Sequence, residues 1–168
     1  MYKAFSIIEL LLVLLILGIL LLIALPFGRD FFEKNRALAY ANELRSALRF
    51  ARFSAIKLGE PVRFCGSSNF KTCDGLWQKG RIIVTDSEKV IRTFPSIFSG
   101  DRIKCNDSFG RDDGIKFLPT GYPNGMRGSF HYCPNGRSEN ALATIFNIAG
   151  RVRISTKDSR GRRINCSL

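Results

Sequence analysis

The sequence predicts an α+β fold in which a long N-terminal helix packs on an antiparallel β-sheet or small β-sandwich. An apolar run fills residues 5–25, and an amphipathic helical pattern continues to residue 58. Short runs rich in Ile, Val and Phe follow, separated by Gly, Pro, Asn and Asp. The chain has 168 residues, 45% of them hydrophobic and 24% charged. These proportions indicate about one globular domain and exclude a disordered or fibrous chain.

The apolar run is long enough to span a bilayer. Only Ser6 and Glu9 are polar within residues 5–25, and a helix of this length measures roughly 31 Å, against a hydrocarbon core of about 30 Å. A cleaved secretory signal is the alternative, but Leu22 stands where its cleavage site needs a small residue. Lys3 precedes the run, which predicts a cytoplasmic N-terminus and places everything after Pro26 outside, in an oxidising compartment.

The N-terminal string Lys3-Ala4-Phe5-Ser6-Ile7-Ile8-Glu9-Leu10 resembles the type IV prepilin signature. The resemblance implies that prepilin peptidase removes residues 1–4 after Ala4 and that Phe5 becomes the N-methylated terminus. It also implies that Glu9 pairs with the N-terminal amine of a neighbouring pilin subunit. A carboxylate inside a membrane helix costs roughly 2.5 to 3.5 kcal/mol, so such a partner is expected on physical grounds too. Ala4 departs from the usual Gly, and Pro26 resembles the helix-kinking proline of pilins.

Residues 26–58 are expected to continue the helix, with an amphipathic pattern from Arg29 onward. Apolar residues recur at steps of three, four and seven, which is one face of a helix; they are Leu44, Ala47, Leu48, Ala51, Ala55 and Leu58. Gly59 and Pro61 supply the stop signals. Arg45, Arg49 and Arg52 form an adjacent stripe, for which we expect a solvated face, with nucleic-acid contact as the alternative.

Residues 59–168 are expected to form a β domain that ends in a basic tail. The predicted strands are 62–65, 81–85, 90–94, 115–118, 129–133, 143–148 and 151–155. The segment from Asn147 to Gly150 is expected to connect the last two as a hairpin. His131 is expected to be a strand residue, and Trp77 a core or sheet-edge aromatic.

The five cysteines suit an oxidising compartment. Our preferred pairing joins Cys65 to Cys73 around a short loop and Cys133 to Cys166 across the tail, leaving Cys105 over; a link from Cys105 to Cys166 is the alternative. The sequence has no Cys-x-x-Cys pair, so we expect no metal site. It also lacks paired carboxylates or a nucleophile constellation, so we expect neither catalysis nor a cofactor.

Several motifs extend the resemblance over most of the chain. They are Cys65 to Cys73 followed by Asp74-Gly75-Leu76-Trp77 and Gly80, then Phe117-Leu118-Pro119-Thr120-Gly121, Gly128-Ser129-Phe130, Cys133, Gly150-Arg151-Val152-Arg153 and Cys166. Together they resemble the FimT/GspH family of minor pilins and pseudopilins, which implies a helix followed by a β domain. The Gly-Arg-x-Arg string is similar to the motif with which FimT-type minor pilins bind DNA during natural transformation.

Charge supports a DNA-binding tail independently of the resemblance. The chain carries a formal charge of +12, which favours anionic partners. Residues 150–168 contain six basic residues and one acidic residue, a net +5. The candidate DNA-binding residues are Gly150, Arg151, Arg153, Lys157, Arg160, Arg162 and Arg163. Side chains two apart on a strand share a face, so Arg151 and Arg153 could meet phosphates together, and residues 159–163 are expected to be flexible.

The sequence therefore favours a minor type IV pilin that binds DNA non-specifically. Its expected partners are the DNA backbone, other pilin subunits, the inner membrane before assembly, and prepilin peptidase. A structural GspH-like pseudopilin of a type II secretion filament is the alternative. The basic tail could also be a solvated end or a contact with anionic lipid.

Overall fold

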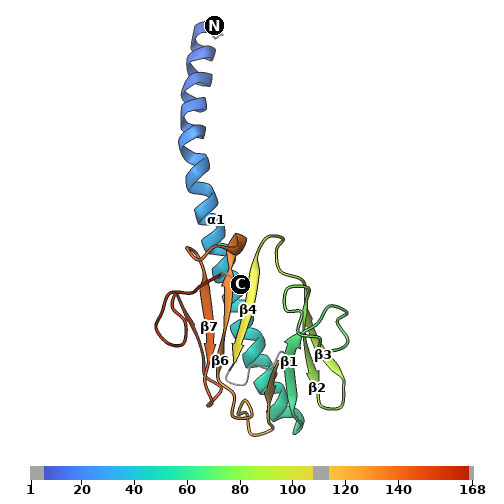
Figure 1. Cartoon of the computed structure of the whole chain (residues 1–168). Helices are drawn as coiled ribbons and strands as arrows, with labels where there is room; N and C mark the ends of the chain where they lie inside the picture. Colours follow the sequence, from blue (N-terminus) through green and yellow to red (C-terminus); the bar gives the residue numbers. More distant parts are fainter. Residues whose placement is uncertain (1–5, 108–113, 167–168) are drawn as a thin grey trace.

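A computed structural model of the protein describes residues 6–107 and 114–166, apart from the side chains of residues 23–27 and 107. It confirms the predicted α+β class. One helix, α1 (Ile7–Leu58), extends away from the domain in its first half and packs against two antiparallel sheets in its second half (Figure 1). The helix continues through Pro26. The predicted leader and cleavage residues, Ala4 and Phe5, lie outside the described residues.

The first half of α1 carries the apolar run. Its large apolar side chains from Ile7 to Leu22 are 48–79% exposed. No helix is long and apolar enough to cross a membrane within the part of the chain that the structure describes. The run predicted to span the membrane, residues 5–25, includes Phe5 and the side chains of residues 23–25, which lie outside that part.

The second half of α1 buries the predicted apolar face. The fully buried residues on this face are Ala37, Ala41, Leu44, Ala47, Leu48, Ala51 and Ala55. The prediction was wrong for Leu58, whose side chain is 49% exposed. Leu58 is the last helical residue, and Ala55 is the last buried residue of this face. Gly59 then ends the helix as predicted, in the left-handed region with φ of 68°, where a residue without Cβ meets no steric penalty.

The strands form two four-stranded antiparallel sheets. The first has the order β3-β2-β1-β5 and contains β1 (Val62–Gly66), β2 (Arg81–Thr85), β3 (Val90–Phe94) and β5 (Ile115–Phe117). The second has the order β4-β6-β7-β8 and contains β4 (Arg102–Asp107), β6 (Gly128–Cys133), β7 (Leu142–Phe146) and β8 (Val152–Ser155). A short 3₁₀ turn, η1 (Pro134–Gly136), follows β6. Strand β4 has no counterpart in the prediction, because only Ile103 and Cys105 are apolar in its alternating sequence.

The core lies between α1 and the two sheets. Trp77 is 5% exposed and packs edge-to-face on Phe64 and Phe130, with ring centroids 5.4 and 4.8 Å apart, which confirms its predicted core position. Arg81 is buried beside this cluster, where its guanidinium contacts Tyr40 and pairs with Glu43 at 2.9 Å. Burial lowers the pKa of Arg81 to about 10. The contacts of Arg81 with Tyr40 and Glu43 link β2 to α1, because a buried guanidinium is strongly destabilising without such partners.

Both preferred disulfides are present. Cys65 joins Cys73 and Cys133 joins Cys166, with Cα atoms 5.6 and 6.0 Å apart. Cys105 lies outside both disulfides, on β4. The second disulfide holds the C-terminal segment against the face of the second sheet that points away from α1.

Candidate nucleic-acid interface

The Gly-Arg-x-Arg string begins in the hairpin turn between β7 and β8. Asn147 shapes the turn, because its side-chain oxygen accepts hydrogen bonds from the backbone N–H groups of Ala149 and Arg151 at 3.1 and 2.9 Å. Gly150 has φ of 71°, and a Cβ there would lie 3.1 Å from the carbonyl oxygen of Gly121. Both features require glycine. Gly150 is buried, so it shapes the turn that places Arg151.

Arg151 and Arg153 are both exposed on the face of the sheet that points away from α1. Arg153 lies opposite Ile145 in the register of β7 and β8, and Ile145 packs in a small cluster under the C-terminal segment. Thr144, the neighbour of Ile145, points the other way and donates a hydrogen bond to the carbonyl of Ala41 on α1 at 3.3 Å. Strand alternation therefore keeps both arginines together on the outer face.

The basic tail is an ordered turn. Lys157 and Arg163 form an antiparallel bridge. Asp158 closes the turn, because its carboxylate accepts hydrogen bonds from the backbone N–H groups of Arg160 and Arg162 at 2.8 and 2.9 Å. These hydrogen bonds, led by that from the Arg162 N–H, lower the pKa of Asp158. Residues 159–163, which the sequence predicts to be flexible, lie in this hydrogen-bonded turn, and composition did not reveal the cap that Asp158 provides.

The cations of this turn differ in how they are held. Arg162 pairs with Asp158 at 3.0 Å, so part of its charge is already compensated. Lys157, Arg160 and Arg163 are exposed, and Ile164 after them is 3% exposed against Ala143 and Ile145. The turn is therefore anchored on both sides, by the Lys157–Arg163 bridge and by the buried Ile164 and Cys166.

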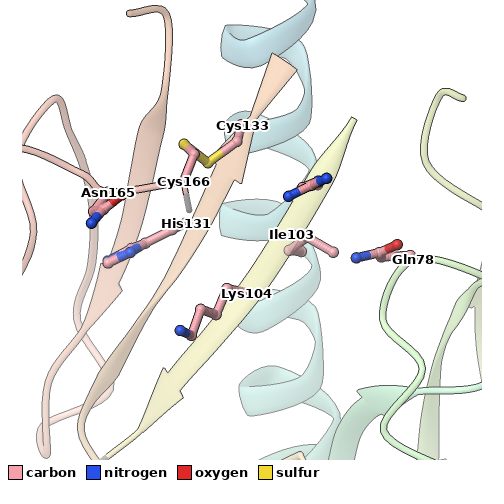
Figure 2. Close-up of a pocket in the computed structure, with 8 residues that line it drawn as sticks. Gln78, Ile103, Lys104, His131, Cys133, Asn165 and Cys166 are labelled. Carbon is pink, nitrogen blue, oxygen red and sulfur yellow. A yellow bond between two sulfur atoms is a disulfide. The ribbon is translucent and has the colours of Figure 1, made fainter. Parts of the chain in front are cut away.

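His131 lies beneath the C-terminal segment as a strand residue, as predicted. Its ring nitrogens are 2.9 Å from the Ser129 hydroxyl and 3.3 Å from the Asn106 amide. Burial lowers its pKa, with Asp158 opposing and Lys104 adding to this shift. Figure 2 shows His131, Lys104 and Asn165 near the Cys133–Cys166 disulfide. The cavity that these residues line has about 20 Å³ of space, enough for about one water molecule, so it offers no room for a small-molecule ligand.

The arginine stripe of α1 reaches the same hairpin from the other side. Arg52 donates a hydrogen bond from Nη1 to the carbonyl oxygen of Gly150 at 3.3 Å. Arg49 is exposed, whereas Arg45 and Arg52 are partly buried. The solvated face expected for this stripe is thus only partly correct, because Arg52 supports the turn before Arg151. Glu9 lies in the first turn of α1 and is exposed.

Two basic residues of β4 were not among the predicted binding residues, because this strand was not predicted. Arg102 lies opposite Cys133, and Lys104 lies opposite His131, in the register of β4 and β6. Both side chains are exposed, on the same outer face as the C-terminal segment. The signal that could have revealed this strand is an alternation of polar and apolar residues, which is typical of a half-buried strand. Arg102, Lys104 and Asn106 alternate with Ile103 and Cys105.

Comparisons with known proteins agree with this architecture. The family model described as type II transport protein GspH matches residues 40–167. The type IV minor pilin FimU of Pseudomonas aeruginosa (strain PAO1) has a TM-score of 0.60 and 20% sequence identity, over 78% of this chain and 98% of that chain. The minor pseudopilin EpsH from the type 2 secretion system of Vibrio cholerae has a TM-score of 0.52 and 11% identity, over 71% and 96%. No curated protein matches the sequence.

The two solved structures share the fold, and the family model covers α1 from Tyr40 onward together with both sheets and the C-terminal segment. A long helix on two antiparallel sheets is the architecture that the N-terminal signature and the β-domain motifs predict. The chain therefore belongs to the GspH/FimT family of type IV pilin-like proteins.

Proposed function

We propose that this chain is a minor type IV pilin that binds DNA without sequence preference during DNA uptake for natural transformation. The observation that carries the proposal is the pair of exposed arginines, Arg151 and Arg153, on one face beside an ordered basic turn. Only Asp158 among residues 150–168 is acidic, and it is engaged with Arg162. This face concentrates positive charge and presents guanidinium groups suited to phosphate.

The chemistry of the face favours backbone contacts over base recognition. Its side chains come from an edge strand and a tight turn, and the core-facing side of the second half of α1 is buried against the sheets. No described element there presents a helix to a major groove, through which proteins most often read base edges. We therefore propose phosphate contacts by Arg151, Arg153, Lys157, Arg160, Arg162 and Arg163, with Gly150 shaping the turn.

Titration of the full chain in neutral detergent with fluorescent DNA duplexes tests the proposal. Non-specific binders have a Kd on the order of 10⁻⁴ to 10⁻⁶ M at physiological salt, and each phosphate contact adds about −0.9 to the slope of log K against log salt. Replacing Arg151 and Arg153 together by Gln should make that slope shallower by about 2. The matched control replaces Lys71 and Lys89 by Gln; both are exposed on connections of the first sheet, and their loss should leave the slope unchanged.

Three results would contradict DNA binding by this face. They are an unchanged slope in the Arg151 and Arg153 variant, a strong preference for one duplex sequence, and binding to anionic lipid vesicles in place of DNA. In cells, the same double variant should lower transformation frequency while its protein level stays equal to that of the parent.

We also propose that residues 5–25 anchor the chain in the inner membrane with residues 59–168 in the periplasm, before assembly with other pilin subunits. The proposal rests on the exposed apolar side chains of the first half of α1, since contiguous apolar surface of this kind marks membrane or protein contacts. Prepilin peptidase would cut after Ala4, and Phe5 would be N-methylated. N-terminal sequencing of the cellular protein should begin at Phe5; an intact Met1 or a start after Ala24 would contradict it. Glu9→Ala should still insert but assemble poorly.

A structural pseudopilin of a type II secretion filament is the second candidate. The fold shared with EpsH and the GspH family model favour it. A structural role does not require DNA binding, so a parent protein that fails to bind duplexes but is needed for secretion would select this alternative.

A further inference from the structure

We infer that the phosphate-binding surface extends beyond β8 and the basic turn to Arg102 and Lys104 on β4, the other edge strand of the second sheet. This inference rests on the proposed DNA-binding function and adds a second group of binding residues to it. Neither residue belongs to the Gly-Arg-x-Arg string or to the tail, and 47 positions separate Lys104 from Arg151 in the sequence.

The strand register places the two groups on one face. Lys104 lies opposite His131 on β6, His131 lies opposite Ala143 on β7, and Ala143 lies opposite Ser155 on β8. These four residues form one row across the sheet, and Arg153 lies two positions from Ser155 on the same face. Three strand spacings of about 4.8 Å put the β4 end of the row roughly 14 Å from the β8 end.

The ordered tail bridges the distance between the two groups. Its first part lies next to β8, with Lys157 and Arg163 paired, and its end reaches β6 through the Cys133–Cys166 disulfide. Arg102, Lys104, Asn165 and Cys166 line one small cavity there, and Figure 2 shows His131 between Lys104 and Asn165. Basic residues therefore lie on both sides of the C-terminal segment that covers this face, with Arg153 and the turn on the β8 side and Arg102 and Lys104 on β4.

The electrostatics of His131 support the same arrangement. The buried ring feels the carboxylate of Asp158 from the tail and the ammonium of Lys104 from β4. Both groups therefore lie near His131, which places the tail turn and β4 around one residue of β6. Arg102 and Lys104 are exposed and lie on the side of the sheet opposite α1.

Replacing Arg102 and Lys104 together by Gln in the full chain in detergent tests the inference. The probe is a fluorescent 30-base-pair duplex, titrated at several salt concentrations. Removing two cations that each meet a phosphate should make the slope of log K against log salt shallower by about 2. The Lys71 and Lys89 control should keep the parental slope. Both exposed positions of β4 accept Gln without touching the core, and the fluorescence of buried Trp77 reports that each variant is folded.

Each outcome decides one question. A shallower slope for the β4 variant with a parental slope for the control supports the extended surface. The inference is overturned if the β4 variant keeps the parental slope while the Arg151 and Arg153 variant has a shallower one. The proposed function then still stands. An equally shallow slope in all three variants also overturns the inference, because net charge alone would then govern DNA binding. A parent chain that binds no DNA overturns the proposed function itself.

Discussion

The Cys133–Cys166 disulfide should contribute more to stability than the Cys65–Cys73 disulfide. The two bonds close loops with sequence separations of 33 and 8. The chain-entropy relation then predicts roughly 3 to 4 kcal/mol for the longer loop and about 2.5 kcal/mol for the shorter. Replacing both cysteines of a pair by Ala tests each bond without adding a buried hydroxyl.

Local effects should increase the difference between the two pairs. Cys166 and Ile164 cover Ala143 and Ile145 on the outer face of the sheet, and without the bond this cover loses its covalent tether. The basic turn should then open. Trypsin should cut the double Ala variant of Cys133 and Cys166 after Arg160, Arg162 or Arg163 much faster than it cuts the parent, in which Asp158 and the disulfide hold the turn.

Urea unfolding of the full chain in detergent, followed by the fluorescence of the single Trp77, measures the two free energies of unfolding. The variant of Cys133 and Cys166 should lose about 1 kcal/mol more than the variant of Cys65 and Cys73. An equal or smaller loss would refute the reasoning. So would an unchanged trypsin pattern, because it would show that hydrogen bonds alone hold the tail.

Two further predictions concern the tail turn and the histidine beneath it. Asp158→Ala raises the net charge by one but removes the acceptor for the Arg160 and Arg162 N–H groups, so it should bind duplex DNA several-fold more weakly than Asp158→Asn, which keeps an acceptor oxygen. Equal affinity of the two variants in the titration with fluorescent duplexes would mean that net charge alone determines DNA binding. Burial lowers the pKa of His131 below its ordinary value of 6.5, so the folded state holds the neutral ring where the unfolded chain binds a proton; this contribution to stability is present above pH 6.5 and is lost as pH falls below it. Urea midpoints at pH 7.5 and 5.5 should therefore differ less in His131→Gln than in the parent, and an equal difference would contradict this.

Local patterns in the sequence were sufficient for the fold class. The apolar period of α1, the stop at Gly59 and the seven predicted strands all depend on residues near one another in the chain, so periodicity and turn chemistry reveal them. The Cys65–Cys73 pairing was accessible for the same reason, since eight positions separate the two cysteines. The Gly-Arg-x-Arg string was recognisable as a motif, and its place in a hairpin followed from the turn residues at Asn147 and Gly150.

Only the tertiary structure could show which basic residues share a surface. Strand β4 escaped detection because its alternation contains just two apolar residues, and without it Arg102 and Lys104 have no assigned face. The Cys133–Cys166 disulfide was the preferred pairing from the sequence, but that the Asp158 carboxylate closes a turn in the tail was visible only in the structure. Arg52 meets Gly150 across 98 positions. Such contacts depend on how distant segments pair and pack, and a local residue pattern carries no information about which distant segment will lie beside it.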